Sequence, residues 1–146
     1  MMMYRPQFFG LEELVCKHVY DKFGDIAWMF LDERALVVLD WIRRSLGKPI
    51  LINNWANDGM YDERGLRCNL CPIVRNKTNN DKVYMSAHVL GRAYDFDVDE
   101  WSAGEVRVWI AANKNNIPYN IRLENNVDWV HLDTYDMGKK VYIFNL

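Results

Sequence analysis

Apolar residues in the first third of the chain recur at the three- and four-residue spacings of a helix. The first stripe contains Leu11, Leu14, Val15 and Val19, and the second contains Trp28, Leu31, Ala35, Leu39, Ile42 and Leu46. Gly47 and Pro49 follow the second stripe, which is the usual order of a C-cap and a helix breaker. The pattern therefore predicts a helical region over residues 10–46, followed by a short strand at 49–53.

The remaining pattern is mostly that of strands. Residues 54–82 are polar and rich in Gly, Asn and Asp, which predicts a long functional loop. Apolar and acidic residues alternate over 94–99, as in a strand, and Ser102 with Glu105 forms a capping box for a helix reaching about residue 115. Strands are predicted at 121–124, 129–133 and 140–144, with turns at Asn125-Asn126 and Met137-Gly138. Helices followed mainly by strands predict an α+β domain with a mainly antiparallel sheet.

Length and net charge indicate a single domain and argue against a nucleic-acid-binding protein. The chain has 146 residues, which suits one domain spanning residues 1–146. It carries 18 basic and 20 acidic residues, for a net charge of -2, without a block of like charge. This balance argues against nucleic acid as a partner. No apolar run approaches the roughly 18 residues of a transmembrane helix, so no membrane span is expected.

The cysteines and the N-terminus bear on location. Residues 1–10 lack a basic segment followed by an apolar one, which predicts synthesis in the cytoplasm without a signal peptide. Three cysteines argue against a disulfide framework. Cys68-x-x-Cys71 could be half of a zinc knuckle or a redox pair, and only Cys16 and His18 could complete a metal site. We interpret the cysteines as reduced, partly buried thiols.

Two of the three histidines, His88 and His131, lie near acidic residues. Two imidazoles and one carboxylate, here Asp95, are a suitable ligand set for a zinc ion that keeps one position for water. Gly91 would let the chain turn between His88 and Asp95, and Asp133 is placed to accept the second N–H of His131. From spacing alone, the alternative is a pair of surface or core histidines beside an acidic strand.

A resemblance to a known family strengthens the metal interpretation. The residues that carry it are Ser86-x-His88-x-x-Gly91-x-Ala93-x-Asp95 and the distant Trp129-Val130-His131. This pair of motifs resembles the zinc D-alanyl-D-alanine carboxypeptidases and phage peptidoglycan endopeptidases, whose fold the hedgehog signalling domain shares. The segments Ile52-Asn53-Asn54-Trp55 and Arg64-Gly65-Leu66-Arg67 resemble the region before the first motif in phage members. The opening helical region is also similar, so the resemblance covers most of the chain.

The resemblance implies a role for five residues. His88, Asp95 and His131 would hold one Zn²⁺ ion. Arg67 would polarise the scissile carbonyl or hold a peptide carboxylate, which suits a planar guanidinium; the alternative is a surface ion pair. Ser86 would hydrogen-bond substrate or orient its loop; the alternative is a simple turn hydroxyl.

The general base is where this chain departs from the family pattern. Many members carry Glu three residues before the final histidine, and here that position is Asp128, which is one methylene shorter. A base must lie within about 3 Å of the water that it deprotonates. Glu124, on the preceding predicted strand, is the second candidate.

These features together predict a zinc-dependent metallopeptidase that hydrolyses amide bonds in peptidoglycan stem peptides, as a D,D-carboxypeptidase or an endopeptidase. Similarity to phage members implies a phage or prophage protein that reaches the cell wall after holin-type release or within a phage particle. The alternative is a non-catalytic zinc-stabilised binding domain or virion structural domain of the same fold, since hedgehog domains keep zinc but act chiefly as signals.

Overall fold

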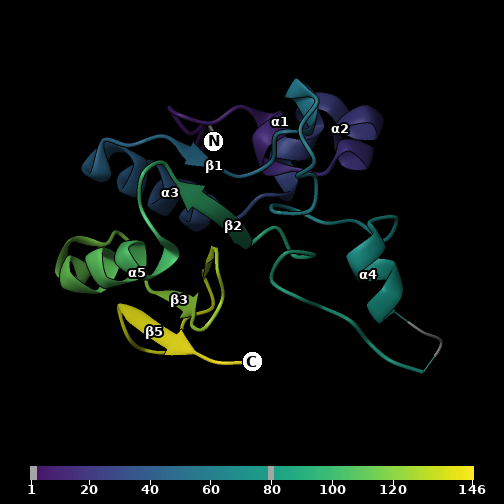
Figure 1. Ribbon diagram of the computed structural model, residues 1–146. Helices are drawn as coiled ribbons and strands as arrows, with labels where there is room; N and C mark the ends of the chain where they lie inside the picture. Colours follow the sequence, from purple (N-terminus) through teal and green to yellow (C-terminus); the bar gives the residue numbers. More distant parts are fainter. Residues whose placement is uncertain (1–2, 79–80) are drawn as a thin grey trace.

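The N-terminal helical region is present but is divided into four pieces. A computed structural model describes residues 3–78 and 81–146 (Figure 1), so residues 1–2 and 79–80 of the predicted N-terminal segment and loop lie outside it. The pieces are α1 (Leu11–Leu14), α2 (Lys17–Phe23), the 3-10 helix η1 (Gly24–Phe30) and α3 (Glu33–Leu46). Asp32 caps α3, and Gly47 ends it in a left-handed conformation with φ of 68°, as predicted.

The segment between α3 and the main sheet contains more regular structure than its composition predicts. It begins with β1 (Ile50–Leu51), followed by the 3-10 helix η2 (Trp55–Asn57). The prediction of a continuous loop over 54–82 is wrong at α4 (Pro72–Lys77). Pro72 begins this helix, where its missing N–H costs no hydrogen bond, and that is the sequence signal for it.

The strands form one sheet in the order β1-β2-β4-β3-β5. They are β2 (Ala93–Val98), β3 (Ile121–Glu124), β4 (Val130–Asp133) and β5 (Val141–Phe144). All pairs are antiparallel except β3 with β5, which is parallel. The predicted α+β fold with a mostly antiparallel sheet is confirmed. The chain that includes the predicted Met137-Gly138 turn, however, does not form a hairpin with β4; it passes β3, and β5 pairs with the far edge of β3.

One helix crosses from β2 to β3. It is α5 (Ala103–Ala112), and it begins at the predicted capping box. Glu105 N donates to the Ser102 hydroxyl, and Ser102 N donates to the Glu105 carboxylate. It ends before residue 115 because a 3-10 helix, η3 (Lys114–Asn116), follows it. α5 packs against β2 and β4.

The sheet has one apolar and one polar face, because successive side chains of a strand point to opposite sides. The apolar face contains Tyr94, Phe96, Val98, Val130, Leu132, Ile121 and Leu123, all buried. The polar face contains Asp95, Asp97, His131, Asp133, Arg122 and Glu124. The apolar face joins the buried residues of α3 and α5 in one hydrophobic core. The polar face therefore remains available for a site.

Strand register brings the predicted site residues together. Asp95 of β2 pairs with His131 of β4, and Arg122 of β3 pairs with Asp133. Continuing the β3–β4 register places Glu124 opposite His131 on the same face. Within residues 3–78 and 81–146, no helix has the length and apolar character needed to cross a membrane.

Candidate metal centre

The three predicted zinc ligands converge on the polar face of the sheet. His88 lies in the turn before β2, Asp95 in β2 and His131 in β4. His88 Nε2 is 3.2 Å from Asp95 Oδ2, and His131 Nδ1 is 2.8 Å from Asp95 Oδ1. One ligand atom from each residue lies within 4.8 Å of the others, and all three residues are buried. This donor set, two imidazole nitrogens and one carboxylate, fits a zinc ion with an open position.

The other nitrogen of each imidazole has its own partner. His88 Nδ1 lies 2.8 Å from the carbonyl oxygen of Gly65, to which it donates its proton. His131 Nε2 lies 3.0 Å from Asp133 Oδ2, so the contact predicted for Asp133 is present. In the neutral tautomers these bonds select, His88 Nε2 and His131 Nδ1 present lone pairs to the Asp95 carboxylate. Only a cation between them, a proton or a metal ion, makes that arrangement favourable.

The turn that carries His88 is fixed by backbone geometry. Gly91 adopts φ of 70°, and its N–H donates to His88 O at 3.2 Å. A Cβ at this position would lie 2.0 Å from the carbonyl oxygen of Phe30. The Ser86 hydroxyl accepts from Val89 N at 3.3 Å. This contact lies within the turn, as expected both for a loop-orienting residue and for a simple turn hydroxyl.

The pKa values of the two imidazoles shift in opposite directions. Burial lowers the pKa of His88. Burial would also lower the pKa of His131, but hydrogen bonds to Asp133 and Asp95 outweigh it and raise that pKa to about 9. Burial would raise the pKa of Asp95, yet His88 and His131 hold it well below its usual value. The carboxylate is therefore ionised at neutral pH, as a metal ligand must be.

Two arginines hold the carboxylates of the site. Arg67 Nη2 donates to Asp95 Oδ2 at 3.0 Å, and its Nε donates to the carbonyl oxygen of Glu63. Its side chain is only 11% exposed, so the ion pair is inside the site and not on the open surface. Arg122 donates to both carboxylate oxygens of Asp133, at 2.9 and 2.8 Å. Planar guanidinium groups suit such paired contacts.

The candidate bases occupy different positions. A cavity of about 440 Å³ opens onto the three ligands, and Glu124, Arg67, Ser86 and Trp129 also line it. Asp128 is exposed and lines an adjoining cavity that also includes Asp95 and Arg67. The structure thus brings Glu124, Arg67 and Ser86 to the same cavity as the ligands, while Asp128 lies to one side.

A second group of side chains could also hold a metal ion. One ligand atom from each of Cys16, His18, Cys68 and Cys71 lies within 4.8 Å of the others. A hydrogen bond with Cys71 lowers the pKa of Cys16 to about 5, and the same contact, with burial, raises the pKa of Cys71. From the sequence these four residues could form a metal site, but the interpretation was reduced, partly buried thiols, because no second CxxC motif follows the first. The structure brings all four together, although about fifty residues separate the first pair from the second.

Comparisons with protein-family models, with curated proteins and with solved structures find no match. The resemblance to zinc peptidases therefore remains an expectation from the motif residues of the sequence.

Proposed function

We propose that this protein is a zinc-dependent peptidase that cleaves amide bonds in the peptide stems of peptidoglycan. The observation that carries the proposal is the convergence of His88, Asp95 and His131 on one wall of a cavity. The resemblance of the surrounding motifs to zinc D,D-carboxypeptidases and phage endopeptidases supplies the substrate class and implies a fold of the hedgehog and D,D-peptidase type.

His88 Nε2, His131 Nδ1 and a carboxylate oxygen of Asp95 would hold the zinc ion. A zinc ion with such ligands acts as a Lewis acid, which makes a water more acidic and polarises a carbonyl group. Gly65 and Asp133 keep the correct nitrogen of each imidazole free for this role. The apolar residues beneath the sheet pack β2 and β4 into the core, which positions Asp95 and His131 beside each other.

A carboxylate must take the proton from the attacking water and return it to the leaving amine. Glu124 is supported by its place in the same cavity and by its register opposite His131. Asp128 is supported by the family pattern and by its place in the adjoining cavity beside Asp95. We assign the role to Glu124 as the first candidate, because its carboxylate lies on the face that carries the ligands.

Cationic groups in the cavity suit a substrate with carboxylates and a developing oxyanion. Arg67 lines both cavities, and its guanidinium stabilises negative charge that forms beside Asp95. Lys77 is exposed at the same cavity and suits the carboxylate groups of a stem peptide. Such a protein would be encoded by a phage or prophage and would reach the wall after holin-type release or within a particle.

The second candidate function is a zinc-stabilised binding or virion structural domain without turnover. The exposure of Asp128 favours it, because the residue at the family's base position does not line the cavity of the ligands. Arg67 also already neutralises Asp95 in the structure. Both functions require the same metal ligands, so the two can be distinguished only by whether the protein cleaves peptidoglycan.

Mass spectrometry of purified peptidoglycan after digestion tests the proposal. Metal-loaded protein should release new stem-peptide fragments, and protein treated with a chelator should not. Glu124→Gln should retain zinc and lose cleavage, whereas Asp128→Asn serves as the matched variant with the alternative carboxylate removed. Zinc bound in stoichiometric amount without any cleavage by the unmodified protein would instead support the binding domain.

A further inference from the structure

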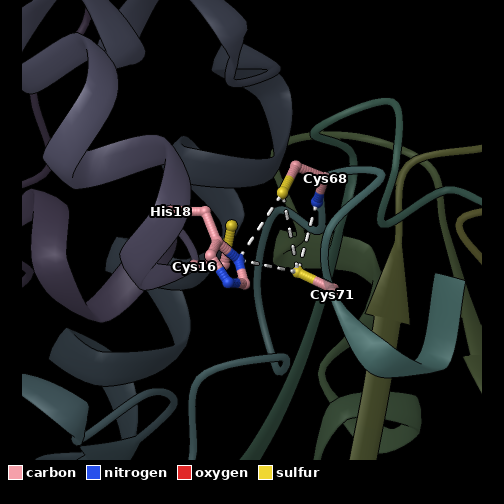
Figure 2. A group of neighbouring side chains, drawn as sticks. All are labelled: Cys16, His18, Cys68 and Cys71. Atoms are coloured by element: carbon pink, nitrogen blue, oxygen red, sulfur yellow. Dashed lines mark hydrogen bonds between the residues drawn. The ribbon is translucent and has the colours of Figure 1, made fainter. Parts of the chain in front are cut away.

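The second ligand group joins two parts of the chain that are distant in sequence. Cys16 precedes α2 and His18 lies in its first turn, while Cys68 and Cys71 precede α4. Figure 2 shows the imidazole of His18 and the sulfurs of Cys16, Cys68 and Cys71 pointing toward a common centre. Cys16 and Cys71 are buried, Cys68 is partly buried and His18 is exposed. The group is therefore closed on the protein side and capped by one imidazole.

Distances within the group match tetrahedral metal ligation. Cys68 Sγ and Cys71 Sγ are 4.0 Å apart, and His18 Nδ1 lies 3.7 and 3.9 Å from them. Zinc–sulfur bonds of about 2.3 Å and zinc–nitrogen bonds of about 2.0 Å at tetrahedral angles separate two sulfurs by roughly 3.8 Å and a sulfur from a nitrogen by roughly 3.5 Å. A disulfide would require about 2 Å between the sulfurs. The ligand atoms of His18, Cys68 and Cys71 thus need only small shifts to bind one ion, and Cys16 Sγ lies within 4.8 Å of each of them.

The turn at Cys68-x-x-Cys71 already directs backbone N–H groups at sulfur. Leu70 N donates to Cys68 Sγ at 3.3 Å, and Cys68 N donates to Cys71 Sγ at 3.4 Å. Cys71 N donates to Cys68 O at 3.1 Å, which closes the turn. Such N–H groups stabilise the negative charge of thiolates, as groups around a ligand commonly do at metal sites.

We propose that Cys16, His18, Cys68 and Cys71 form a structural zinc site, separate from the site on the sheet. Three sulfurs and one nitrogen complete a tetrahedral shell and leave no open position, so this ion would not take part in catalysis. Binding would convert the thiols to thiolates and release their protons to solvent. The proposal does not depend on the peptidase activity.

The ion would fix the segment that supplies the other site. Leu66 N donates to Leu14 O at 2.9 Å and Cys16 N donates to Leu66 O at 3.0 Å, so this segment already pairs with the chain before α2. Gly65 O accepts from His88 Nδ1, and Arg67 N donates to His88 O at 3.2 Å. A metal clamp directly after Arg67 would therefore hold both Arg67 and the carbonyl group that orients His88.

Cobalt substitution tests this site, because a thiolate ligand gives a sulfur-to-cobalt charge-transfer band that a site of imidazoles and carboxylate lacks. The unmodified protein should bind two metal ions per chain by native mass spectrometry and show the band. His88→Ala should lose one ion and keep the band. The double variant Cys68→Ser with Cys71→Ser should lose the other ion and the band, and hydrogen exchange over residues 64–71 should rise.

Several outcomes would overturn the site. One is the absence of the thiolate band in the cobalt-loaded, reduced protein, and another is a single bound ion that disappears with His88→Ala. Rapid alkylation of all three cysteines in zinc-loaded protein would also exclude it. If the double variant does not fold, the spectra of the unmodified protein and of His88→Ala still decide. If the double cysteine variant loses the band but still cleaves peptidoglycan, the cysteine site is separate from the peptidase activity, and the two proposals are tested independently.

Discussion

Asp133 and His131 lie on the same face of β4, with Asp133 Oδ2 3.0 Å from His131 Nε2. Asp133 is fully buried and also accepts two hydrogen bonds from Arg122. We predict that Asp133→Asn lowers the affinity of the site on the sheet for zinc by about 10- to 100-fold. The neutral amide is a weaker acceptor than the carboxylate, so it orients the His131 imidazole less firmly. Competition with a chromogenic chelator measures this affinity in protein whose cysteine ligands are already filled.

Asp136→Asn is the control for that measurement. Asp136 follows the same strand but is exposed, and it accepts from Asn120 and from Gly138 N. Its replacement should leave zinc affinity unchanged. Equal affinities for Asp133→Asn and the unmodified protein would show that Asp133 does not position His131.

The features that the sequence predicted well depend on local patterns. The capping box of Ser102 and Glu105, the C-cap at Gly47 and the strand Ile121–Glu124 each follow from residues within one or two turns of each other. Period-two alternation also predicts which side chains of β2 share a face, and therefore where Asp95 points.

The features that the sequence did not predict depend on distant pairing. β5 pairs with β3 because the chain after β4 passes β3, and the Met137-Gly138 turn is equally compatible with a hairpin. The approach of Cys16 to Cys68 requires the pairing of Leu66 with Leu14. The motifs did predict that His88, Asp95 and His131 would lie close together, and their ligand atoms lie within 4.8 Å of one another. The place of Glu124 in the cavity was predictable only once the β3–β4 register was known.

On the proposed function, we expect Arg67 to contribute to cleavage more than to metal retention. Its guanidinium reaches both Asp95 and Glu63 O, which a single ammonium group cannot reproduce. On the proposed function, Arg67→Ala should reduce the cleavage rate by on the order of 10²- to 10³-fold, the usual loss when an oxyanion donor is removed. Arg67→Lys should recover part of that rate. Rates of stem-peptide release at measured zinc content test this.

Arg75→Ala is the matched control, because Arg75 is an exposed cation on α4. It should leave the cleavage rate unchanged. Full activity of Arg67→Ala would show that Arg67 has no part in cleavage and only forms the ion pair with Asp95.

Gly91 is the position where the turn before β2 least tolerates a side chain. Its φ is 70°, and a Cβ would lie 2.0 Å from Phe30 O, a backbone atom. Gly91→Ala should lower the free energy of unfolding by about 3 kcal/mol, the upper end for a strained backbone position. Gly138 has φ of 73° with open space around it, so Gly138→Ala should cost only about 1 kcal/mol. Urea denaturation measures both, and equal losses would contradict the clash.

Asp32 predicts a pH dependence of stability. Its carboxylate caps α3 through Arg34 N at 2.9 Å and accepts from Thr134 Oγ1 at 3.1 Å. Burial would raise the pKa of Asp32, but hydrogen bonds from Arg34 and Thr134 outweigh burial and lower it. Because the pKa is lower in the folded state than in the unfolded one, the ionised group stabilises the fold above about pH 4. This contribution disappears as the pH falls through the folded-state pKa.

Asp32→Asn isolates the charge, because the amide oxygen can still accept from Arg34 N. At about pH 6 the variant should be less stable than the unmodified protein by about 1–2 kcal/mol, and the difference should shrink toward about pH 3 as Asp32 itself becomes protonated. Urea denaturation across this range measures it. Asp21→Asn, which removes an exposed pair with Lys17, should change stability by no more than about 0.5 kcal/mol. A difference for Asp32→Asn that stays constant or grows as the pH falls would show that its charge does not stabilise the fold.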